Sequence, residues 1–165
     1  MNIRHAATKI QSDTRPTFHD VTAFAEAFVE EIGAKSGIAV VYSQHTTCSV
    51  MIQEQSDDTD FYGEQLLMKD LVDVLAKIAP TCEHEGQYLH PGMKHVTIAK
   101  EERNEEFWWS LNTDAHLRSV IMGRSAVVPI MDGKMVLGEF GKIYFADFDQ
   151  VRARERTVRM TVIYE

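Results

Sequence analysis

The sequence predicts an α+β domain in which strands outnumber helices. Two segments, residues 21–32 and 67–78, repeat apolar residues at the spacing of an amphipathic helix. The last quarter of the chain, from residue 126 onward, forms short apolar runs or alternates apolar with polar residues, which is typical of strands. A chain of 165 residues suits a single domain, residues 1–165, that buries roughly two-thirds of its unfolded surface.

Composition and charge narrow the class of partner. The 17 basic and 25 acidic residues give a net charge of −8, which disfavours nucleic acid as a partner. No apolar stretch approaches the ~18 residues of a membrane span, and the N-terminus lacks an apolar signal segment. We therefore expect no membrane partner and a cytoplasmic protein. Cys48 and Cys82 do not form a CxxC pair, so neither a zinc knuckle nor a thioredoxin-like motif is supported.

The first half of the chain predicts three strands and a helix. Residues 2–11 have the loose mixture of an edge strand. The helix over 21–32 carries a stripe of Val, Phe, Ala and Ile, and a glycine at 33 or 37 ends it. Residues 38–42 and 50–52 are short β-branched runs that predict two buried strands.

A polar tripeptide, His45, Thr46 and Thr47, separates these two strands. An imidazole and two hydroxyls at the rim of core strands are held by a rigid scaffold, where sites are usually built. The alternative is that His45 bonds a backbone group while the threonines cap a turn.

An acidic stretch, residues 54–60, is expected to cap the next helix, residues 67–78, which Pro80 ends. Asp57, Asp58 and Asp60 resemble a calcium-binding loop. The glycine and glutamate that an EF-hand needs at its sixth and twelfth positions are missing, so that motif is excluded.

Residues 81–110 are the least regular part of the sequence. They contain His84, His90 and His95 and the pair Trp108 and Trp109. A connection of this length in a compact domain tends to be functional or mobile. Its mixed charges predict a solvated face, with a lid or a subunit contact as the alternative.

Asn112 or Thr113 can cap a short helix that runs to Met122 and ends at Gly123. His116 then lies in the first turn, where the unpaired N–H groups and the helix dipole favour an anion such as phosphate. The alternative is a short packing helix whose histidine faces solvent.

The C-terminal part predicts four strands, over residues 126–131, 134–137, 142–148 and 157–164. Asp132-Gly133 favours a type I′ hairpin turn between the first two. Arg152, Arg154 and Arg156 alternate before the last strand. They can grip a pyrophosphate, or pair with the acids at 147, 149 and 155.

Taken together, several patterns resemble one family, the YjbQ family, also described as secondary thiamine-phosphate synthase. The resemblance covers the chain from about Gly37 to the C-terminus. The patterns are HisThrThr at 45–47 with Glu54 downstream, TyrLeuHis at 88–90, AsnThrAspAlaHis at 112–116, ValProIleMetAspGly at 128–133, LeuGly at 137–138 and AspGlnValArgAlaArg at 149–154.

The resemblance implies a compact, β-rich, sandwich-like α+β fold with a few packed helices, and a homotrimer with sites near subunit interfaces. It also implies a divalent metal, zinc or magnesium, on His45, His90 and His116. The stretch between His90 and His116 is longer than the family pattern, so His84 and His95 are alternatives to His90. Residues 139–141, GluPheGly, replace a ThrTrpGln-like triplet of the family.

The implied function is a transferase that joins an aminopyrimidine methyl diphosphate to a thiazole phosphate and releases pyrophosphate. The implied catalytic residues are His45, Glu54 and His116, and the implied substrate- and phosphate-binding residues are Thr46, Thr47, Asn112 and Arg154. One alternative is a metal-dependent hydrolase of a small phosphorylated or amide substrate, with Glu54 as general base. The other is a trimeric metal- or ligand-binding protein without catalytic activity.

Overall fold

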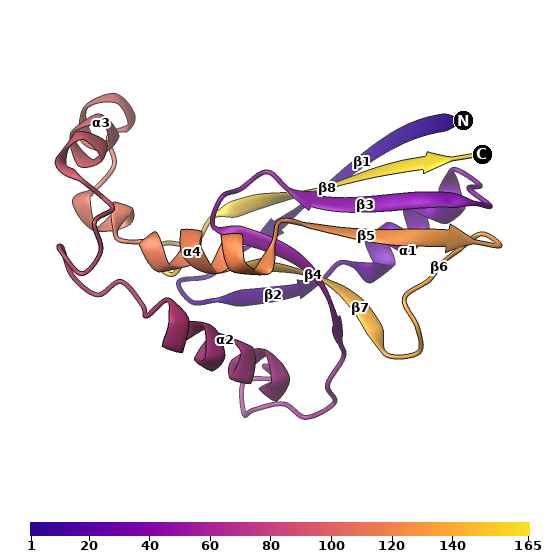
Figure 1. Cartoon of the computed structure of the whole chain (residues 1–165), viewed down its shortest axis with the longest axis horizontal. Helices are drawn as coiled ribbons and strands as arrows, with labels where there is room; N and C mark the ends of the chain where they lie inside the picture. Colours follow the sequence, from indigo (N-terminus) through magenta and orange to yellow (C-terminus); the bar gives the residue numbers. More distant parts are fainter.

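Two antiparallel sheets form the centre of the molecule, which a computed structural model describes over all 165 residues (Figure 1). The first sheet has the order β1-β8-β3-β5-β6 and the second β2-β7-β4. The strands of the first are β1 (Asn2–Gln11), β8 (Glu155–Tyr164), β3 (Gly37–Ser43), β5 (Ser125–Met131) and β6 (Lys134–Met135). Those of the second are β2 (Thr17–Asp20), β7 (Gly141–Asp147) and β4 (Cys48–Glu54). The predicted β-rich, sandwich-like α+β fold is confirmed.

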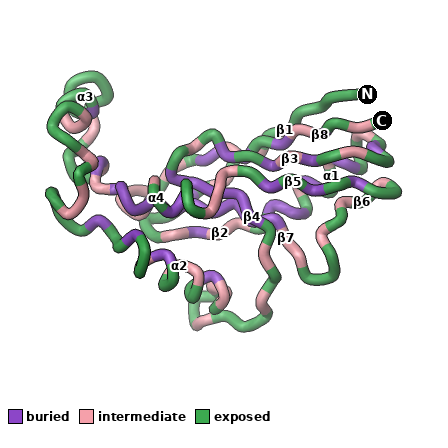
Figure 2. The backbone as a smooth tube through the Cα atoms, viewed as in Figure 1, coloured by how far each residue is buried: buried purple, intermediate pink, exposed green.

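The main core fills the space between the two sheets. Val158, Met160 and Val162 of β8 alternate inward, as the period of the last strand predicts. They pack with Val50 of β4 and Phe145 of β7, and the middle of the strands is correspondingly buried (Figure 2). Helix α1 (Thr22–Glu31) closes this core, with its Ala and Val side chains buried against it.

Two further helices, α2 (Leu66–Ile78) and α4 (Thr113–Met122), cover the other face of the second sheet. Leu75 of α2 and Ala115 of α4 pack on Phe148 and its neighbours. The Ser119 hydroxyl of α4 donates to the carbonyl oxygen of Cys48 at 2.7 Å. This bond fixes α4 beside the start of β4.

Most predicted elements are confirmed. The helix predicted over 21–32 is α1, and Gly33 follows it with a φ of 65°. The helix predicted from Asn112 or Thr113 to Met122 is α4, with Asn112 at its N-cap position but without a side-chain capping bond. Asp132 and Gly133 have φ values of 52° and 79°, as a type I′ turn requires.

The region predicted to be the least regular, residues 81–110, has no helix or strand over 81–92 but contains two helices that were not predicted. Helix α3 spans Met93–Arg103 and the 3₁₀ helix η1 spans Phe107–Ser110. Only Ala99 of α3 is buried, so this helix has no apolar stripe from which its period could be recognised. It lies mostly exposed at the end of the molecule opposite the two termini (Figures 1 and 2).

Helix α2 is not capped by the acidic stretch as predicted. Gln65 is at the N-cap position and makes no side-chain capping bond. Asp60 instead accepts the N–H groups of Tyr62 and Glu64 and forms an ion pair of 2.7 Å with Lys69. The acid therefore closes its own loop onto the first turn of α2.

Candidate functional site

The segment between β3 and β4 crosses from one sheet to the other. Because β3 belongs to the first sheet and β4 to the second, residues 44–47 bridge the two layers at one end of the core. Ser43 fixes this turn: its hydroxyl accepts the N–H of His45 at 3.1 Å and lies 3.3 Å from the His45 carbonyl oxygen. The N–H of Cys48 donates to that same carbonyl at 3.2 Å. The backbone around His45 is thus held from both sides.

His45 reaches across to the last strand. Its Nε2 accepts the backbone N–H of Thr157 at 2.9 Å. Because a backbone amide can only donate, Nε2 carries the lone pair and Nδ1 carries the proton. Burial, and next the positive charge of Arg156, lower the pKa of His45. His45 is therefore a neutral imidazole that presents an N–H at Nδ1.

His116 is held through its other ring nitrogen. It lies in the first turn of α4, and its Nδ1 donates to the carbonyl oxygen of Thr46 at 3.2 Å. A carbonyl can only accept, so Nδ1 carries the proton and Nε2 keeps a free lone pair. Burial lowers the pKa of His116, and the bond to Thr46 offsets part of this. His116 is therefore neutral and presents an acceptor.

His90 and His95 extend this group of imidazoles. The ring centroid of His90 lies 4.8 Å from that of His95 and 5.8 Å from that of His116. The Thr113 hydroxyl donates to the His90 carbonyl at 2.6 Å, so it accepts the Nδ1 proton of His90 at 2.9 Å. His84 is exposed and hydrogen-bonds the carbonyl oxygen of its neighbour Glu85.

The three histidines that the resemblance implies as metal ligands do not fit a metal ion in this arrangement. His90 and His116 each keep a free Nε2, with the other nitrogen fixed by a hydrogen bond, as in many metal sites. The lone pair of His45, however, is used by Thr157. No group of three or more His, Cys, Asp or Glu side chains is arranged to hold a metal ion. The divalent metal stays a prediction.

The alternating arginines have different interaction partners. Arg156 is buried and binds both carboxylate oxygens of Asp147, at 2.6 and 3.1 Å, and the Thr47 hydroxyl at 3.0 Å. Arg154 forms a longer ion pair, 3.5 Å, with Asp149. The predicted pairing with the acids at 147 and 149 is thus confirmed, whereas Glu155 pairs with Lys9 instead, at 2.7 Å.

Arg154 is incompletely neutralised. The Asp149 oxygen that faces it is shared with Arg156 and with the Asn112 amide, both at 3.4 Å. The ion pair with Asp149 uses the buried Nε of Arg154, whereas the terminal guanidinium nitrogens make neither a hydrogen bond nor an ion pair. Burial lowers the pKa of this guanidinium, which remains half-buried. Arg154 is therefore the arginine of the three that is available to an anion.

These groups line one cavity of about 380 Å³ at the end of the sheets. His45, Thr46, Thr47, Asn112, His116 and Arg154, all predicted from the sequence, lie around it. Three arginines and one carboxylate, that of Glu105, line it, while the buried Asp147 and Asp149 pair with Arg156 and Arg154 from behind. A cavity of this kind attracts anions.

Two predicted site residues lie outside this lining. His90 is next to it, in ring contact with His116. Glu54 is the last residue of β4, and six residues of extended strand, about 20 Å, separate it from Cys48 at the cavity end. The structure therefore brings His45 and His116 together but places Glu54 far from both in the protomer.

Sequence reasoning missed a set of lining residues from the α3–η1 segment, residues 93–110. They are Arg103, Glu105, Trp109 and Ser110, while His95, predicted as an alternative to His90, also lines the cavity. The tryptophan pair and the idea of a lid pointed to this segment, but nothing in the spacing singled out which residues face the cavity.

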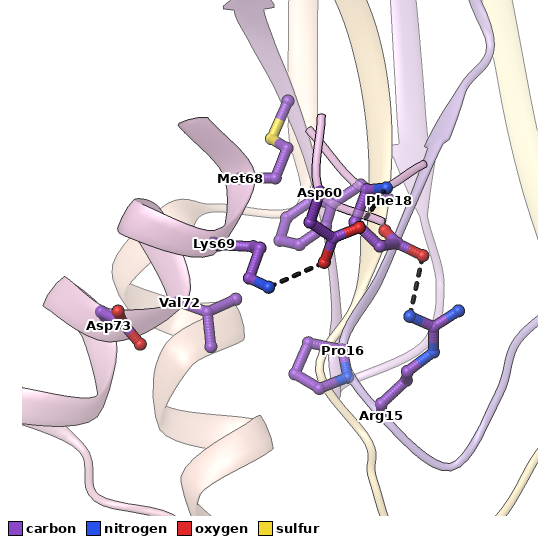
Figure 3. Close-up of a pocket in the computed structure, with 9 residues that line it drawn as sticks. Arg15, Pro16, Phe18, Asp60, Met68, Lys69, Val72 and Asp73 are labelled. Atoms are coloured by element: carbon purple, nitrogen blue, oxygen red, sulfur yellow. Dashed lines mark hydrogen bonds and ion pairs between the residues drawn. The ribbon is translucent and has the colours of Figure 1, made fainter. Parts of the chain in front are cut away.

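A second, smaller cavity of about 190 Å³ lies between β2, the 60–64 loop and α2 (Figure 3). Four of its five charged groups are paired, Lys69 with Asp60 at 2.7 Å and Arg15 with Glu64 at 2.8 Å, and only Asp73 has no partner. Phe18 and Met68 provide apolar lining. These pairs attach the loop to the body, and they leave less unpaired charge for a ligand than the larger cavity has.

Fold and cavity together define a two-sheet antiparallel α+β protein with a histidine- and arginine-lined pocket at one end. The family model described as UPF0047 protein YjbQ-like matches residues 6–165. The chain belongs to this YjbQ-like UPF0047 family. The resemblance seen from Gly37 onward is confirmed and extends through almost the whole chain.

Two relatives and two solved structures show how close the similarity is. A UPF0047 protein from Archaeoglobus fulgidus is 31% identical over 140 residues, covering 85% of this chain and 87% of the relative. YugU from Bacillus subtilis is 30% identical over 152 residues, covering 92% and 95%. Crystal structures of proteins from Aeropyrum pernix and Clostridium acetobutylicum superpose with TM-scores of 0.73 and 0.71 at 25% and 26% identity. They cover 98% and 96% of this chain and 99% of each of theirs.

None of the helices combines the length and the apolar character that a bilayer crossing requires.

Proposed function

We propose that the cavity is the active site of a transferase of the secondary thiamine-phosphate synthase type. It joins an aminopyrimidine methyl diphosphate to a thiazole phosphate and releases pyrophosphate. The observation that carries this proposal is that His45 and His116 line one arginine-containing cavity as the same Nδ1–H tautomer but are fixed through different nitrogens, so that one presents an N–H and the other a lone pair.

The cationic lining supports binding of a phosphorylated ligand. Arg154 lines the cavity with its terminal guanidinium nitrogens unpaired, and the start of α4 contributes the positive end of a helix dipole beside Asn112. Arg156 is committed to Asp147 and holds Thr47 in place. Arg154 therefore binds the anion, while Arg156 shapes the wall behind it.

The proposed reaction exchanges one bond for another without oxidation or reduction. The bond between the pyrimidine methylene carbon and the bridging oxygen breaks, and its electron pair leaves with pyrophosphate. The lone pair of the thiazole nitrogen forms the new carbon–nitrogen bond, and the thiazole becomes a cation. Positive groups near the leaving oxygen lower the barrier because negative charge develops there.

The two histidines have distinct roles in this reaction. The Nδ1–H of His45 donates to the bridging oxygen as it becomes negative, and Thr157 prevents the ring from turning its lone pair there instead. The Nε2 of His116 accepts a hydrogen bond from an N–H of the substrate, which orients the reacting methylene group.

The test uses variants that keep each structural hydrogen bond and remove the reacting nitrogen. In His45→Gln the side-chain oxygen can still accept the Thr157 N–H, and in His116→Asn the side-chain amide can still donate to Thr46. We expect each to lower kcat for pyrophosphate release by about 10²–10⁴-fold. His84→Asn, outside the cavity, is the matched control and should retain full activity.

The outcomes separate three functions. Pyrophosphate release that requires both precursors supports the transferase. Release of product from one precursor and water identifies a hydrolase and contradicts the proposal. Tight pyrophosphate binding without turnover of either precursor identifies a binding protein and also contradicts it.

We also propose that the chain forms the homotrimer that the resemblance implies. Leu117, Val120 and Ile121 lie on one face of α4 and are exposed. A contiguous exposed apolar stripe of this kind is typical of an interface. Because α4 begins at the cavity, an interface along this helix places the active site near a subunit boundary.

A further inference from the structure

Trp109 is the one apolar side chain that lines the cavity. It lies in η1 and is half-buried, whereas its neighbour Trp108 is exposed and does not line the cavity. The Arg152 guanidinium carbon lies 4.0 Å from the centroid of the Trp109 ring, and Arg152 is held in turn by Glu105 at 2.6 Å. The indole is therefore fixed in place before any ligand arrives.

Ser110, the next residue, also lines the cavity. Only 3% of the surface of Ser110 is exposed, and its hydroxyl has no hydrogen-bond partner. Buried hydroxyls are nearly always paired, so an unpaired one beside a cavity calls for an explanation. A serine hydroxyl can turn through its staggered χ1 rotamers and meet a polar group of a ligand.

We infer that Trp109 and Ser110 form a subsite for a flat, nitrogen-containing aromatic ring. Trp109 stacks on the face of the ring, and the Ser110 hydroxyl bonds a ring nitrogen or an amino group at its edge. This inference rests on the proposed function, because it assigns a place in the same cavity to the ring of the phosphorylated substrate.

The subsite and the anion-binding residues come from different parts of the chain. Trp109 and Ser110 belong to the α3–η1 segment, whereas Arg154 precedes β8 and His45 follows β3. A ligand that meets both carries its phosphate and its aromatic ring at separate ends. An inorganic phosphate or pyrophosphate has no ring and therefore contacts only the anion-binding residues. The contributions of the ring subsite and of the anion-binding residues to affinity can thus be measured separately.

The experiment measures binding of two probes by calorimetry on the full-length protein, without turnover. The ring probe is an aminopyrimidine methyl monophosphate, and the anion probe is inorganic pyrophosphate. Trp109→Leu should weaken the ring probe by about tenfold or more, since loss of stacking on one base has that effect. It should leave the pyrophosphate Kd unchanged, which also shows that the variant is folded.

Three further variants sharpen the result. Trp108→Leu is the matched control and should bind both probes as the wild type does. Trp109→Phe keeps an aromatic face and should recover most of the ring affinity. Ser110→Ala should weaken the ring probe about threefold to tenfold, with no fall in melting temperature because the lost hydroxyl had no partner.

The inference is overturned if the wild type does not bind the ring probe, if Trp108→Leu and Trp109→Leu weaken it equally, or if Trp109→Leu weakens pyrophosphate as much. These results are independent of catalysis. Ring binding that depends on Trp109 supports the subsite even if no transferase activity is found. Transferase activity with unaltered ring binding in Trp109→Leu refutes the subsite alone.

Discussion

The backbone N–H of Thr157 donates to Nε2 of His45 across 2.9 Å, joining residues that are 112 positions apart in the sequence. This single bond connects the turn between the sheets to the start of β8 and fixes the tautomer of the imidazole. His45 therefore stabilises the fold through Nε2 and would react through Nδ1, so the two roles can be separated by experiment.

Replacement of His45 tests that separation. His45→Ala leaves the Thr157 N–H without a partner and should lower the free energy of unfolding by about 1–3 kcal/mol. His45→Gln supplies another acceptor and should recover most of this loss without recovering turnover. Urea denaturation of both variants measures the difference, and equal stability of the two would show that the bond contributes nothing.

Arg156 should matter more for folding than for binding. Arg156→Met leaves the fully buried carboxylate of Asp147 unpaired, and we expect a loss of about 3–5 kcal/mol in the free energy of unfolding. Arg159→Met, on the exposed side of the same strand, is the control and should change it by less than about 0.5 kcal/mol. Similar urea midpoints for the two variants would refute this role of Arg156.

Acidification should destabilise the protein. Burial lowers the pKa of His19, His45, His90 and His116 below the ordinary value of 6.5. The unfolded chain then binds more protons than the native one as the pH falls below 6.5, so the free energy of unfolding decreases.

The stabilising contribution is thus complete above about pH 6.5 and is lost as the pH falls toward the lowered values. The melting temperature should fall between pH 7.5 and 5, by about 2–4 °C for each kcal/mol lost. The double variant His45→Gln/His116→Asn should show a shallower dependence. A wild-type melting temperature that is constant over this range would contradict the prediction.

Glu54 provides a test of the site's location. Because it lies at the other end of β4 from the cavity, we expect Glu54→Gln to change kcat by less than about twofold. A large loss of activity would mean that the Glu54 side chain of a neighbouring subunit reaches the cavity.

The apolar stripe of α4 should control assembly. Val120→Asp/Ile121→Asp places two charges on this exposed face and should convert a trimer to a monomer, as judged by light scattering. Leu89→Asp, at a fully exposed position outside α4, is the control and should leave the mass unchanged. A double variant of unaltered mass would exclude this face as the interface.

Sequence patterns predicted most helices and strands because these elements depend on residues that are neighbours in the sequence. The alternation along Thr157–Tyr164 reports which side chains face the core, and the Asp132-Gly133 turn needs two positive φ values that these residues tolerate. Helix α3 was not predicted because a helix with one buried residue has no periodic apolar pattern. Nothing local indicated that β3 and β4 belong to different sheets.

The site was predicted only in part because it depends on contacts between distant segments. Spacing drew attention to His45 and His116, but their tautomers depend on Thr157 and on the Thr46 carbonyl, which no periodicity shows. The unpaired hydroxyl of Ser110 is a property of the packed structure alone. Which of two adjacent tryptophans faces the cavity likewise requires coordinates.

The α3–η1 segment leaves the two sheets after α2 and returns to them at α4, while packing little of itself into the core. Changes within it therefore cost the scaffold little stability and leave His45, His116 and Arg154 where they are. We therefore expect relatives with superposable sheets to differ mainly in the sequence of the α3–η1 segment. Such differences would change which substrates the cavity accepts.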